Sequence, residues 1–140
     1  MIYFFTGKPG NGKSLHMAEI IYHALRSGKH VIANFPIDDS FTYVGKNADK
    51  CGWFIYEPNK YWLNNVYKNK TDRFSYLDGL YNFARYCHKK GKDGKIKEGQ
   101  TLLVLDECQE LFNTRSWNRK DRLSWCSFFR QHRKLGYDVY

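Results

Sequence analysis

The residues from Gly7 to Ser14 constrain the fold of this chain more than any other stretch of its sequence. They read Gly-Lys-Pro-Gly-Asn-Gly-Lys-Ser and match the phosphate-binding pattern G-x-x-x-x-G-K-[ST]. The apolar run over residues 2–5 before them predicts a buried strand. The apolar residues after them recur at helical spacing, at Met17, Ile20, Ile21, Ala24 and Leu25. Strand, glycine-rich loop and helix in this order predict an α/β P-loop fold.

The residue types of this loop suit a nucleotide. Glycine at three of its positions allows positive φ, so that the backbone N–H groups close around phosphate oxygens in front of a helix dipole. We expect Lys13 to reach the β- and γ-phosphates and the Ser14 hydroxyl to ligate Mg²⁺. The bland alternative is a glycine-rich turn without a ligand. The candidate nucleotide-binding residues are Gly7, Lys8, Pro9, Gly10, Asn11, Gly12, Lys13, Ser14 and Leu15.

A second apolar run, over residues 101–105, ends in two acids. Its continuous hydrophobicity predicts a strand that is buried on both faces of a parallel sheet. Asp106 is then a candidate Mg²⁺ ligand, and Glu107 is a candidate catalytic residue that polarises the attacking water. Lys13, which we expect to reach the γ-phosphate with its positive charge, is the second candidate catalytic residue. Two acids after a strand also begin many solvated loops and helices, but the phosphate-binding pattern elsewhere favours function.

The remaining pattern predicts a parallel sheet flanked by helices on both faces, in a single domain over residues 1–140. We expect further strands over residues 29–35, 53–56 and from 137 onward, and further helices over 72–90 and 121–134. The inward positions expected in these two helices are Tyr76, Leu80, Ala84, Cys87, Trp125, Phe128 and Phe129. A basic, glycine-punctuated connection over residues 89–97 joins the first of them to the acidic strand.

Composition narrows the partners and the compartment. The 23 basic and 14 acidic residues give a formal charge of +9, which favours polyanions such as nucleic acid, nucleotide or an acidic lipid surface. The four cysteines are widely spaced and predict reduced thiols in a cytosolic protein. No apolar run reaches the ~18 residues of a membrane span.

Aromatic residues make up 18% of the chain, and some alternate with basic ones. Such a pattern occurs in sites for single-stranded DNA, where bases stack on rings in a basic groove. The alternative, which we favour, is that the rings fill the core and the lysines face solvent. The residues in question are Tyr61, Trp62, Tyr67, Phe74 and Tyr76 with Lys60, Lys68, Lys70 and Arg73.

Four segments together resemble the N-terminal ATPase domain of the zonular occludens toxin (Zot) family, which includes filamentous-phage assembly proteins. They are the loop Gly7 to Ser14, the acidic stretch Leu-Asp-Glu-Cys-Gln-Glu-Leu-Phe at 105–112, Arg115, and residues 131–139, which contain His-Arg-x-x-Gly-x-Asp. The loop is generic, whereas the second and fourth segments are fairly specific. The resemblance covers nearly the whole chain.

The resemblance implies an oligomeric motor that hydrolyses ATP with Mg²⁺ to drive phage assembly and extrusion at the cytoplasmic face of the host inner membrane. Its implied partners are copies of itself, phage DNA or virion proteins. It also implies an extra strand, opening at Tyr137, between the loop strand and the acidic strand. We therefore expect a soluble cytoplasmic N-terminal part of a longer protein, which a later segment anchors to the membrane.

ATPases of this type commonly use an arginine, often from a neighbouring subunit, to neutralise charge on the γ-phosphate. Arg115, Arg130 and Arg133 are the candidates, and solvated helix surface is the alternative for each. Two other functions stay open: a small nucleotide kinase, and a non-catalytic toxin-like binding module. Glu107 beside Asp106 favours water activation over a kinase. Oligomer size and the choice between ATP and GTP are left open by the sequence.

Overall fold

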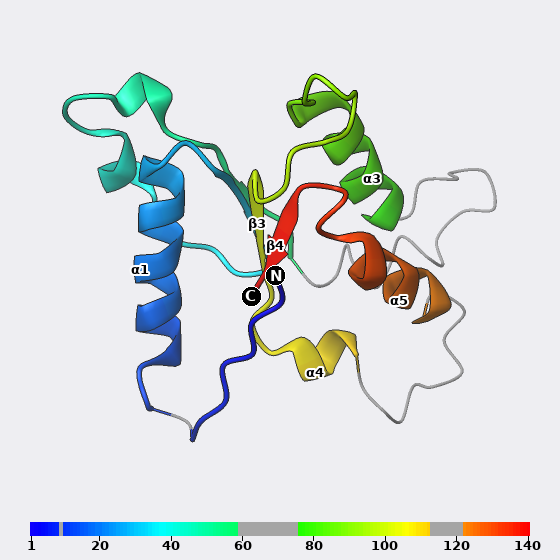
Figure 1. The fold of residues 1–140 in the computed structure, drawn as a ribbon. Helices are drawn as coiled ribbons and strands as arrows, with labels where there is room; N and C mark the ends of the chain where they lie inside the picture. Colours follow the sequence, from blue (N-terminus) through cyan, green and yellow to red (C-terminus); the bar gives the residue numbers. More distant parts are fainter. Residues whose placement is uncertain (9, 59–75, 113–121) are drawn as a thin grey trace.

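A four-stranded, wholly parallel sheet lies at the centre of the computed structural model, which describes residues 1–8, 10–58, 76–112 and 122–140 (Figure 1). The strand order is β2-β1-β3-β4. The strands are β1 (His30–Ala33), β2 (Phe54–Tyr56), β3 (Thr101–Val104) and β4 (Tyr137–Val139). The helices are α1 (Lys13–Arg26), α3 (Tyr76–Cys87), α4 (Cys108–Leu111) and α5 (Arg122–Gln131), with the short 3₁₀ turns η1 (Ser40–Tyr43) and η2 (Ala48–Lys50).

One face of the sheet is covered by α1. Successive side chains of a strand point to opposite faces, so alternate residues of β1 and β3 share this face. The predicted stripe of α1 packs onto them, with Ile21 and Leu25 fully buried. The buried residues of this layer are Met17, Ile21, Leu25, Val31, Ala33, Leu102 and Val104.

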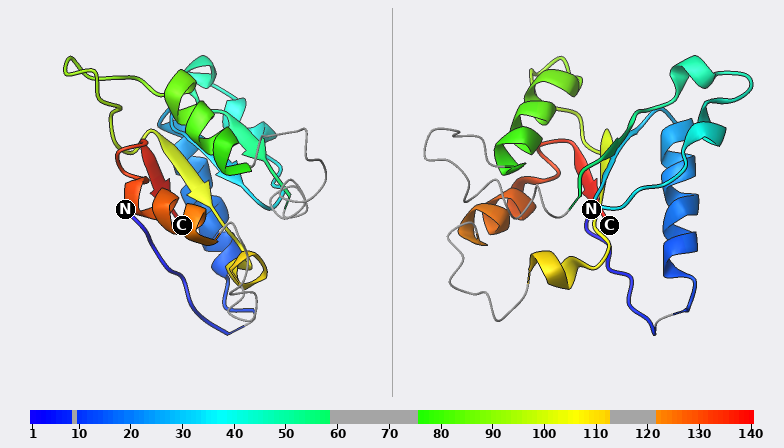
Figure 2. Two further views of the ribbon diagram at one scale, coloured as in Figure 1. Left: turned by 90° about the vertical axis from the view of Figure 1, so that its right-hand side faces the viewer. Right: turned by 180° about the vertical axis from the view of Figure 1, so that it is seen from behind.

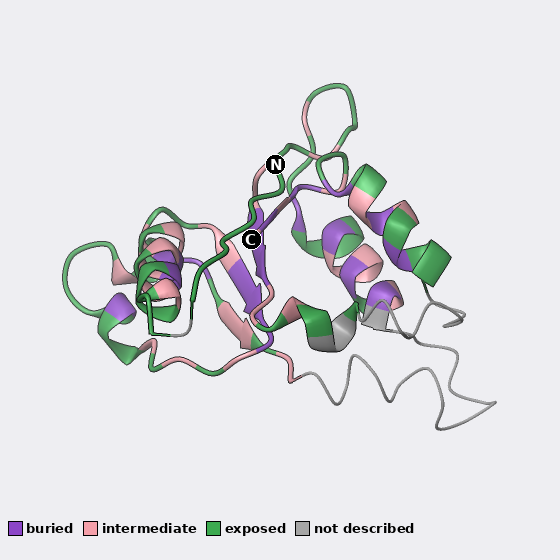
Figure 3. Cartoon of the chain, turned by 90° about the horizontal axis from the view of Figure 1, so that it is seen from below, coloured by how far each residue is buried: buried purple, intermediate pink, exposed green. Residues whose placement is uncertain are grey.

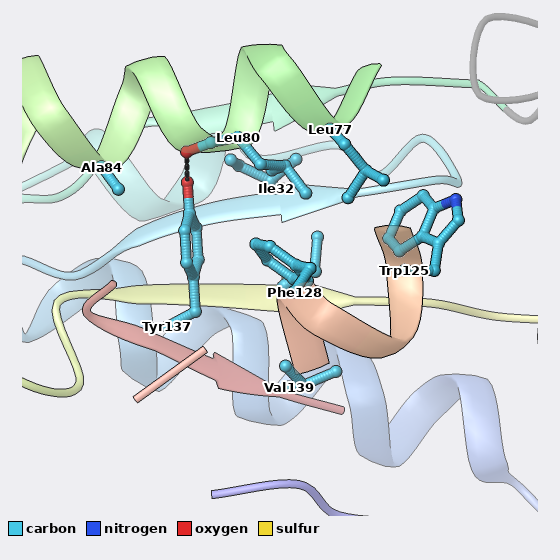
Figure 4. Close-up of a cluster of buried hydrophobic side chains, with 9 residues drawn as sticks. Ile32, Leu77, Leu80, Ala84, Trp125, Phe128, Tyr137 and Val139 are labelled. Carbon is cyan, nitrogen blue, oxygen red and sulfur yellow. Dashed lines mark hydrogen bonds between the residues drawn. The ribbon is translucent and has the colours of Figure 1, made fainter. Parts of the chain in front are cut away.

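The opposite face is covered by α3 and α5, which lie across the sheet from α1 (Figure 2). The Tyr137 ring is fully buried there, and its hydroxyl donates a hydrogen bond of 2.8 Å to the Leu80 carbonyl (Figure 4). The buried residues of this layer are Ile32, Leu77, Leu80, Ala84, Leu103, Trp125, Phe128, Tyr137 and Val139. Helices therefore flank both faces of a parallel sheet, and the predicted fold class is confirmed.

The prediction of a buried strand over residues 2–5 is wrong. Residues 1–8 are exposed along their length (Figure 3), with Phe4 at 79% of its full exposure. Only Ile2 makes a strand bridge, to Val139 of β4. The segment pairs with no other strand in the described residues, and neither layer of helices covers it. The residues of this run are apolar, but their hydrophobicity alone does not show whether another segment covers them.

The position of this segment nevertheless confirms the expected extra strand. β4 pairs in parallel with β3 on one side. On its other side, the Tyr3 N–H donates to the Val139 carbonyl at 2.8 Å, and the Val139 N–H donates to the Met1 carbonyl at 2.9 Å. The strand that opens at Tyr137 therefore lies between the segment leading into the loop and the acidic strand.

The two later helices are confirmed, but both end three residues earlier than predicted, at residues 87 and 131, and one inward position is wrong. Trp125 and Phe128 are buried and Phe129 packs against them, as predicted for α5. In α3, Leu80 and Ala84 face inward as expected, but Cys87 is exposed. Cys87 ends the helix, and the buried residue at that point is the next one, His88. The aromatic and basic residues before Tyr76 lie outside the described residues, so neither interpretation of them is tested.

Candidate nucleotide-binding site

The glycine-rich loop leads directly into α1. Gly12 is the N-cap of the helix and has φ 72° and ψ 15°, a left-handed conformation that glycine adopts without steric cost. The first intrahelical bond joins the His16 N–H to the Gly12 carbonyl at 3.0 Å. The N–H groups of the first turn therefore point out of the helix end, and this turn contains no acidic residue. A helix end of this kind attracts an anion.

Lys13 folds back over the loop. Its Nζ donates to the Gly7 carbonyl at 3.0 Å and to the Lys8 carbonyl at 3.1 Å. An ammonium group has three donors, so one remains for a phosphate oxygen. Next to it, the exposed Ser14 lies in the first turn of α1. Lys13 and Ser14 are thus neighbouring hydrogen-bond donors at the start of α1. Pro9 lies outside the described residues.

The acidic motif lies at the same edge of the sheet as this loop. Both views in Figure 2 and the view in Figure 1 place the start of α1 and the start of α4 at one end of the strands. Asp106 and Glu107 join β3 to α4. Because β3 is parallel to its neighbours, the carboxyl ends of these strands lie at one edge of the sheet, which is the edge where P-loop folds bind ligands.

The backbone at Glu107 is strained. This residue has φ 49° and ψ 43°, in the left-handed region, which costs a side chain about 1 kcal/mol or more. The Glu107 N–H donates to the Asp106 carboxylate at 2.9 Å, and the Gln109 side-chain amide donates to the Glu107 carboxylate. The side chain is exposed, so its carboxylate is accessible to solvent and ligand.

Asn34 is a site residue that the sequence analysis missed. Its amide donates to the Asp106 carbonyl at 2.7 Å, and its carbonyl accepts the Asp106 N–H at 2.8 Å. Asn34 is buried and directly follows β1, which is the neighbour of β3 in the sheet. Its side chain therefore holds both the N–H and the carbonyl of Asp106 in place. The sequence does hold one signal for this role, because Asn34 is a polar residue directly after an apolar strand.

The structure describes two of the three candidate arginines, Arg130 and Arg133. Arg115 lies outside the described residues. Arg130 is exposed near the end of α5. Arg133 donates to the Glu98 carboxylate through Nε at 3.0 Å and through an Nη at 2.9 Å. Glu98 precedes β3, so Arg133 lies at the amino edge of the sheet, opposite the loop of its own chain.

The arrangement fits Mg²⁺ held by few protein ligands. No cluster of three or more His, Cys, Asp or Glu side chains that could hold a metal occurs among the described residues. Mg²⁺ in nucleotide sites needs no such cluster, since it binds one or two protein oxygens together with phosphate and water. Ser14 and Asp106 supply oxygens of this kind. Within residues 1–8, 10–58, 76–112 and 122–140, no helix combines the length and hydropathy of a membrane span.

Comparisons with known proteins find one family model and several similar proteins of filamentous phages. The profile of the family described as zonular occludens toxin (Zot) matches residues 60–140. The Gene 1 proteins of Enterobacteria phages fd and M13 are 32% identical over 138 residues, which is 99% of this chain and 34% of each relative. The Gene 1 protein of Salmonella phage IKe is 31% identical over 144 residues. The chain spans about a third of the length of these relatives. No solved structure matches.

Proposed function

Because this chain belongs to the zonular occludens toxin (Zot) family, we propose that the carboxyl edge of its sheet binds Mg-ATP and hydrolyses it to drive filamentous-phage assembly. One observation supports this most strongly. The glycine-rich loop and the acidic pair are far apart in the sequence, yet they lie at the same edge of the sheet (Figure 1). Mg-ATP supplies the phosphoanhydride bond, and the residues of the chain position it.

In this proposal the loop and the first turn of α1 hold the phosphates. Backbone N–H groups of the loop and the helix end face the anion, and the Lys13 ammonium neutralises charge on the β- and γ-phosphates. Asp106, fixed by Asn34, and the Ser14 hydroxyl are the Mg²⁺ ligands. Gly7, Lys8, Pro9, Gly10, Asn11, Gly12 and Leu15 complete the nucleotide-binding set.

Glu107 has the catalytic role. Its carboxylate orients water and accepts a proton from it as the water attacks the γ-phosphate. Two features of the residue support the assignment: its exposed side chain and its left-handed backbone. Strained backbone concentrates at functional sites, where the surrounding structure maintains it.

The substitution Glu107→Gln tests this assignment. It keeps the size of the side chain and removes the base, so turnover should fall by about 10²-fold or more while Mg-ATP affinity stays within about twofold. Phosphate release and calorimetric titration measure the two quantities. Glu19→Gln is the matched control, because it makes the same exchange at an exposed side chain of α1 that belongs to no proposed site. Equal turnover of Glu107→Gln and the parent protein would remove Glu107 from the mechanism.

We propose further that an arginine acts on the nucleotide of a neighbouring copy. Arg133 lies opposite the loop of its own chain, and Arg130 is exposed, so both can face a neighbour. Arg115 stays a prediction of the same kind. Loss of the acting arginine should lower turnover by about 10³-fold.

Mixing identifies the acting arginine. An arginine-to-alanine variant mixed with Lys13→Ala should recover turnover, because each copy supplies what the other lacks. Turnover that is independent of protein concentration, without recovery on mixing, would indicate a self-sufficient monomer. The expectations of one domain over residues 1–140 and of a membrane anchor outside this chain stay predictions.

A further inference from the structure

Among the described residues, a lysine-rich hairpin over residues 89–97 is the strongest charged feature that the nucleotide site does not use. It joins the end of α3 to the start of β3. Between Arg85 and Lys97 the chain has six basic residues and one acidic residue, Asp93, a net +5 out of the formal +9 of the whole chain. All five lysines of the hairpin are exposed: Lys89, Lys90, Lys92, Lys95 and Lys97.

The hairpin has a defined backbone. Lys90 and Ile96 form an antiparallel bridge, and the Gly91 N–H donates to the Lys95 carbonyl at 2.8 Å. Its tip turns at Gly94, whose φ is 74°, and the Asp93 carboxylate accepts the Lys95 N–H at 3.1 Å. The lysines are therefore carried by a fixed turn.

One side chain braces the base of the hairpin. The Gln100 carbonyl accepts the Lys89 N–H at 2.8 Å. The amide of Gln100 donates to the carbonyls of Lys89 and Lys97 at 3.0 and 2.8 Å. Both arms of the hairpin are thus tied to the residue that immediately precedes β3.

Two residues anchor the hairpin to the buried layer below it. Ile96 packs against that layer and is partly buried. His88, just before the hairpin, is 5% exposed and bonds to the Leu135 carbonyl at 2.6 Å and to the Thr101 hydroxyl at 2.7 Å. The apolar side chain of the hairpin therefore points inward, and its charged side chains point outward.

An exposed aromatic ring comes just before these lysines in the chain. Tyr86, in the last turn of α3, is 76% exposed. The Arg85 guanidinium lies 5.7 Å from the centre of its ring. A solvent-exposed ring next to arginine and lysine is the combination that single-stranded nucleic acid uses, because bases stack on rings while cations contact phosphates.

We propose that this surface, formed by Arg85, Tyr86 and the hairpin 89–97, binds the backbone and bases of single-stranded DNA. Nucleic acid is favoured over an acidic membrane because the hairpin exposes lysines while its isoleucine packs inward against the buried layer, leaving no apolar side chain at the tip to enter a bilayer. Figures 1 and 2 place the hairpin at the end of the sheet away from the glycine-rich loop. The surface is therefore separate from the nucleotide site, and this proposal does not depend on ATP hydrolysis.

The test measures binding of a fluorescein-labelled 20-mer of thymidylate by anisotropy, at several salt concentrations and without nucleotide. The first variant is Lys90→Glu/Lys92→Glu. The control is Lys46→Glu/Lys50→Glu, which makes the same change in net charge at exposed lysines of the η1–η2 segment. The hairpin variant should lose at least tenfold in affinity. Loss of two phosphate contacts should also reduce the salt slope by about 1.4.

Stacking is tested separately with Tyr86→Ala and Tyr86→Phe. The alanine variant should bind the oligonucleotide at least fivefold more weakly, and the phenylalanine variant should bind like the parent. The urea midpoint of unfolding should stay close to that of the parent in all of these variants, because the changed side chains are exposed. This control shows that the variants are folded whether or not the chain binds Mg-ATP, so failure of this proposal and failure of the proposed ATPase are told apart.

Three outcomes would overturn the proposal. The first is an equal loss of DNA affinity in the hairpin and control variants, which would indicate a response to net charge alone. The second is no DNA binding by the parent at 50 mM salt. The third is hairpin-dependent binding to vesicles of phosphatidylglycerol without binding to the oligonucleotide, which would assign the surface to a membrane.

Discussion

The two edges of the parallel sheet are held in different ways. At the amino edge, buried or partly buried side chains make several short hydrogen bonds each, as His88 does to Leu135 and Thr101, and as Gln100 does to both arms of the hairpin. At the carboxyl edge, the glycine-rich loop is exposed, and the bonds of Lys13 within the described residues go to loop carbonyls. Left-handed glycines occur at both edges, but at the carboxyl edge Glu107, a residue with a side chain, also takes this conformation.

The difference matches the roles proposed for the two edges. A binding edge has to present unsatisfied donors and charges to its ligand, so it cannot satisfy them internally. The scaffold compensates through the two buried layers on the sheet and through Asn34, which ties Asp106 to β1. Stability should therefore be most sensitive to changes in the scaffold, and nucleotide affinity to changes at the carboxyl edge.

The largest effect on stability should follow Gly52→Ala. A Cβ at this buried glycine would overlap the Lys29 carbonyl just before β1. The two segments are held together there by the bond from the Val31 N–H to the Trp53 carbonyl at 2.8 Å. The free energy of unfolding should fall by about 3 kcal/mol or more. The control is Gly79→Ala in α3, where a Cβ meets nothing within 4 Å. It should stabilise by about 0.5–1 kcal/mol. Urea denaturation gives both values, and similar values would contradict this packing.

Asn34→Ala should have the next largest effect. It leaves the Asp106 N–H and carbonyl without the side chain that pairs them, which should cost about 1–3 kcal/mol. Mg²⁺-dependent nucleotide affinity should fall as well, because Asp106 loses its support. Asn34→Asp keeps the acceptor, loses the donor and should not restore either property. A variant with parent stability and parent affinity would show that Asp106 is placed without Asn34.

Stability should fall as the pH is lowered from 7 to 5. Burial lowers the pKa of His88 below its usual value, with a further effect of nearby His30, and burial and Lys89 lower the pKa of His30. The unfolded chain thus binds more protons below about pH 6.5, so the stability present above that pH is lost as the pH falls, at up to ~1.4 kcal/mol per pH unit for each group.

Urea denaturation at pH 7.5 and 5.5 checks this dependence. His88→Gln should reduce the difference between the two pH values, while the exposed His23→Gln should leave it unchanged. Equal stability of the parent at both pH values would contradict a neutral, buried His88.

Arg133→Ala should have the smallest effect on stability. Its pair with Glu98 is exposed, with side-chain exposures of 63% and 58%, and exposed pairs contribute about 0.2–1 kcal/mol. A loss above 2 kcal/mol would give this pair a structural role at the amino edge. A large loss of turnover without a loss of stability would support its action on a neighbouring nucleotide.

The sequence predicted the parts of this fold that depend on local periodicity. The strands 101–105 and 29–35 and the helical stripes of α1 and α5 are found close to their expected positions, since each buries a continuous apolar face. Residues 2–5 and Cys87 were misplaced because an apolar residue cannot indicate whether another segment covers it. Asn34 and His88 were missed because their roles come from partners that are distant in the sequence.

Calorimetric titration of Mg-ATP into the parent and Lys13→Ala tests the central claim most directly, namely that the carboxyl edge is a nucleotide site. Lys46→Ala, which removes an exposed lysine elsewhere, is the matched control. We predict saturable binding to the parent and the control, at least tenfold weaker binding to Lys13→Ala, and weaker binding to the parent when EDTA removes Mg²⁺. Equal affinity of Lys13→Ala and the parent would contradict the claim.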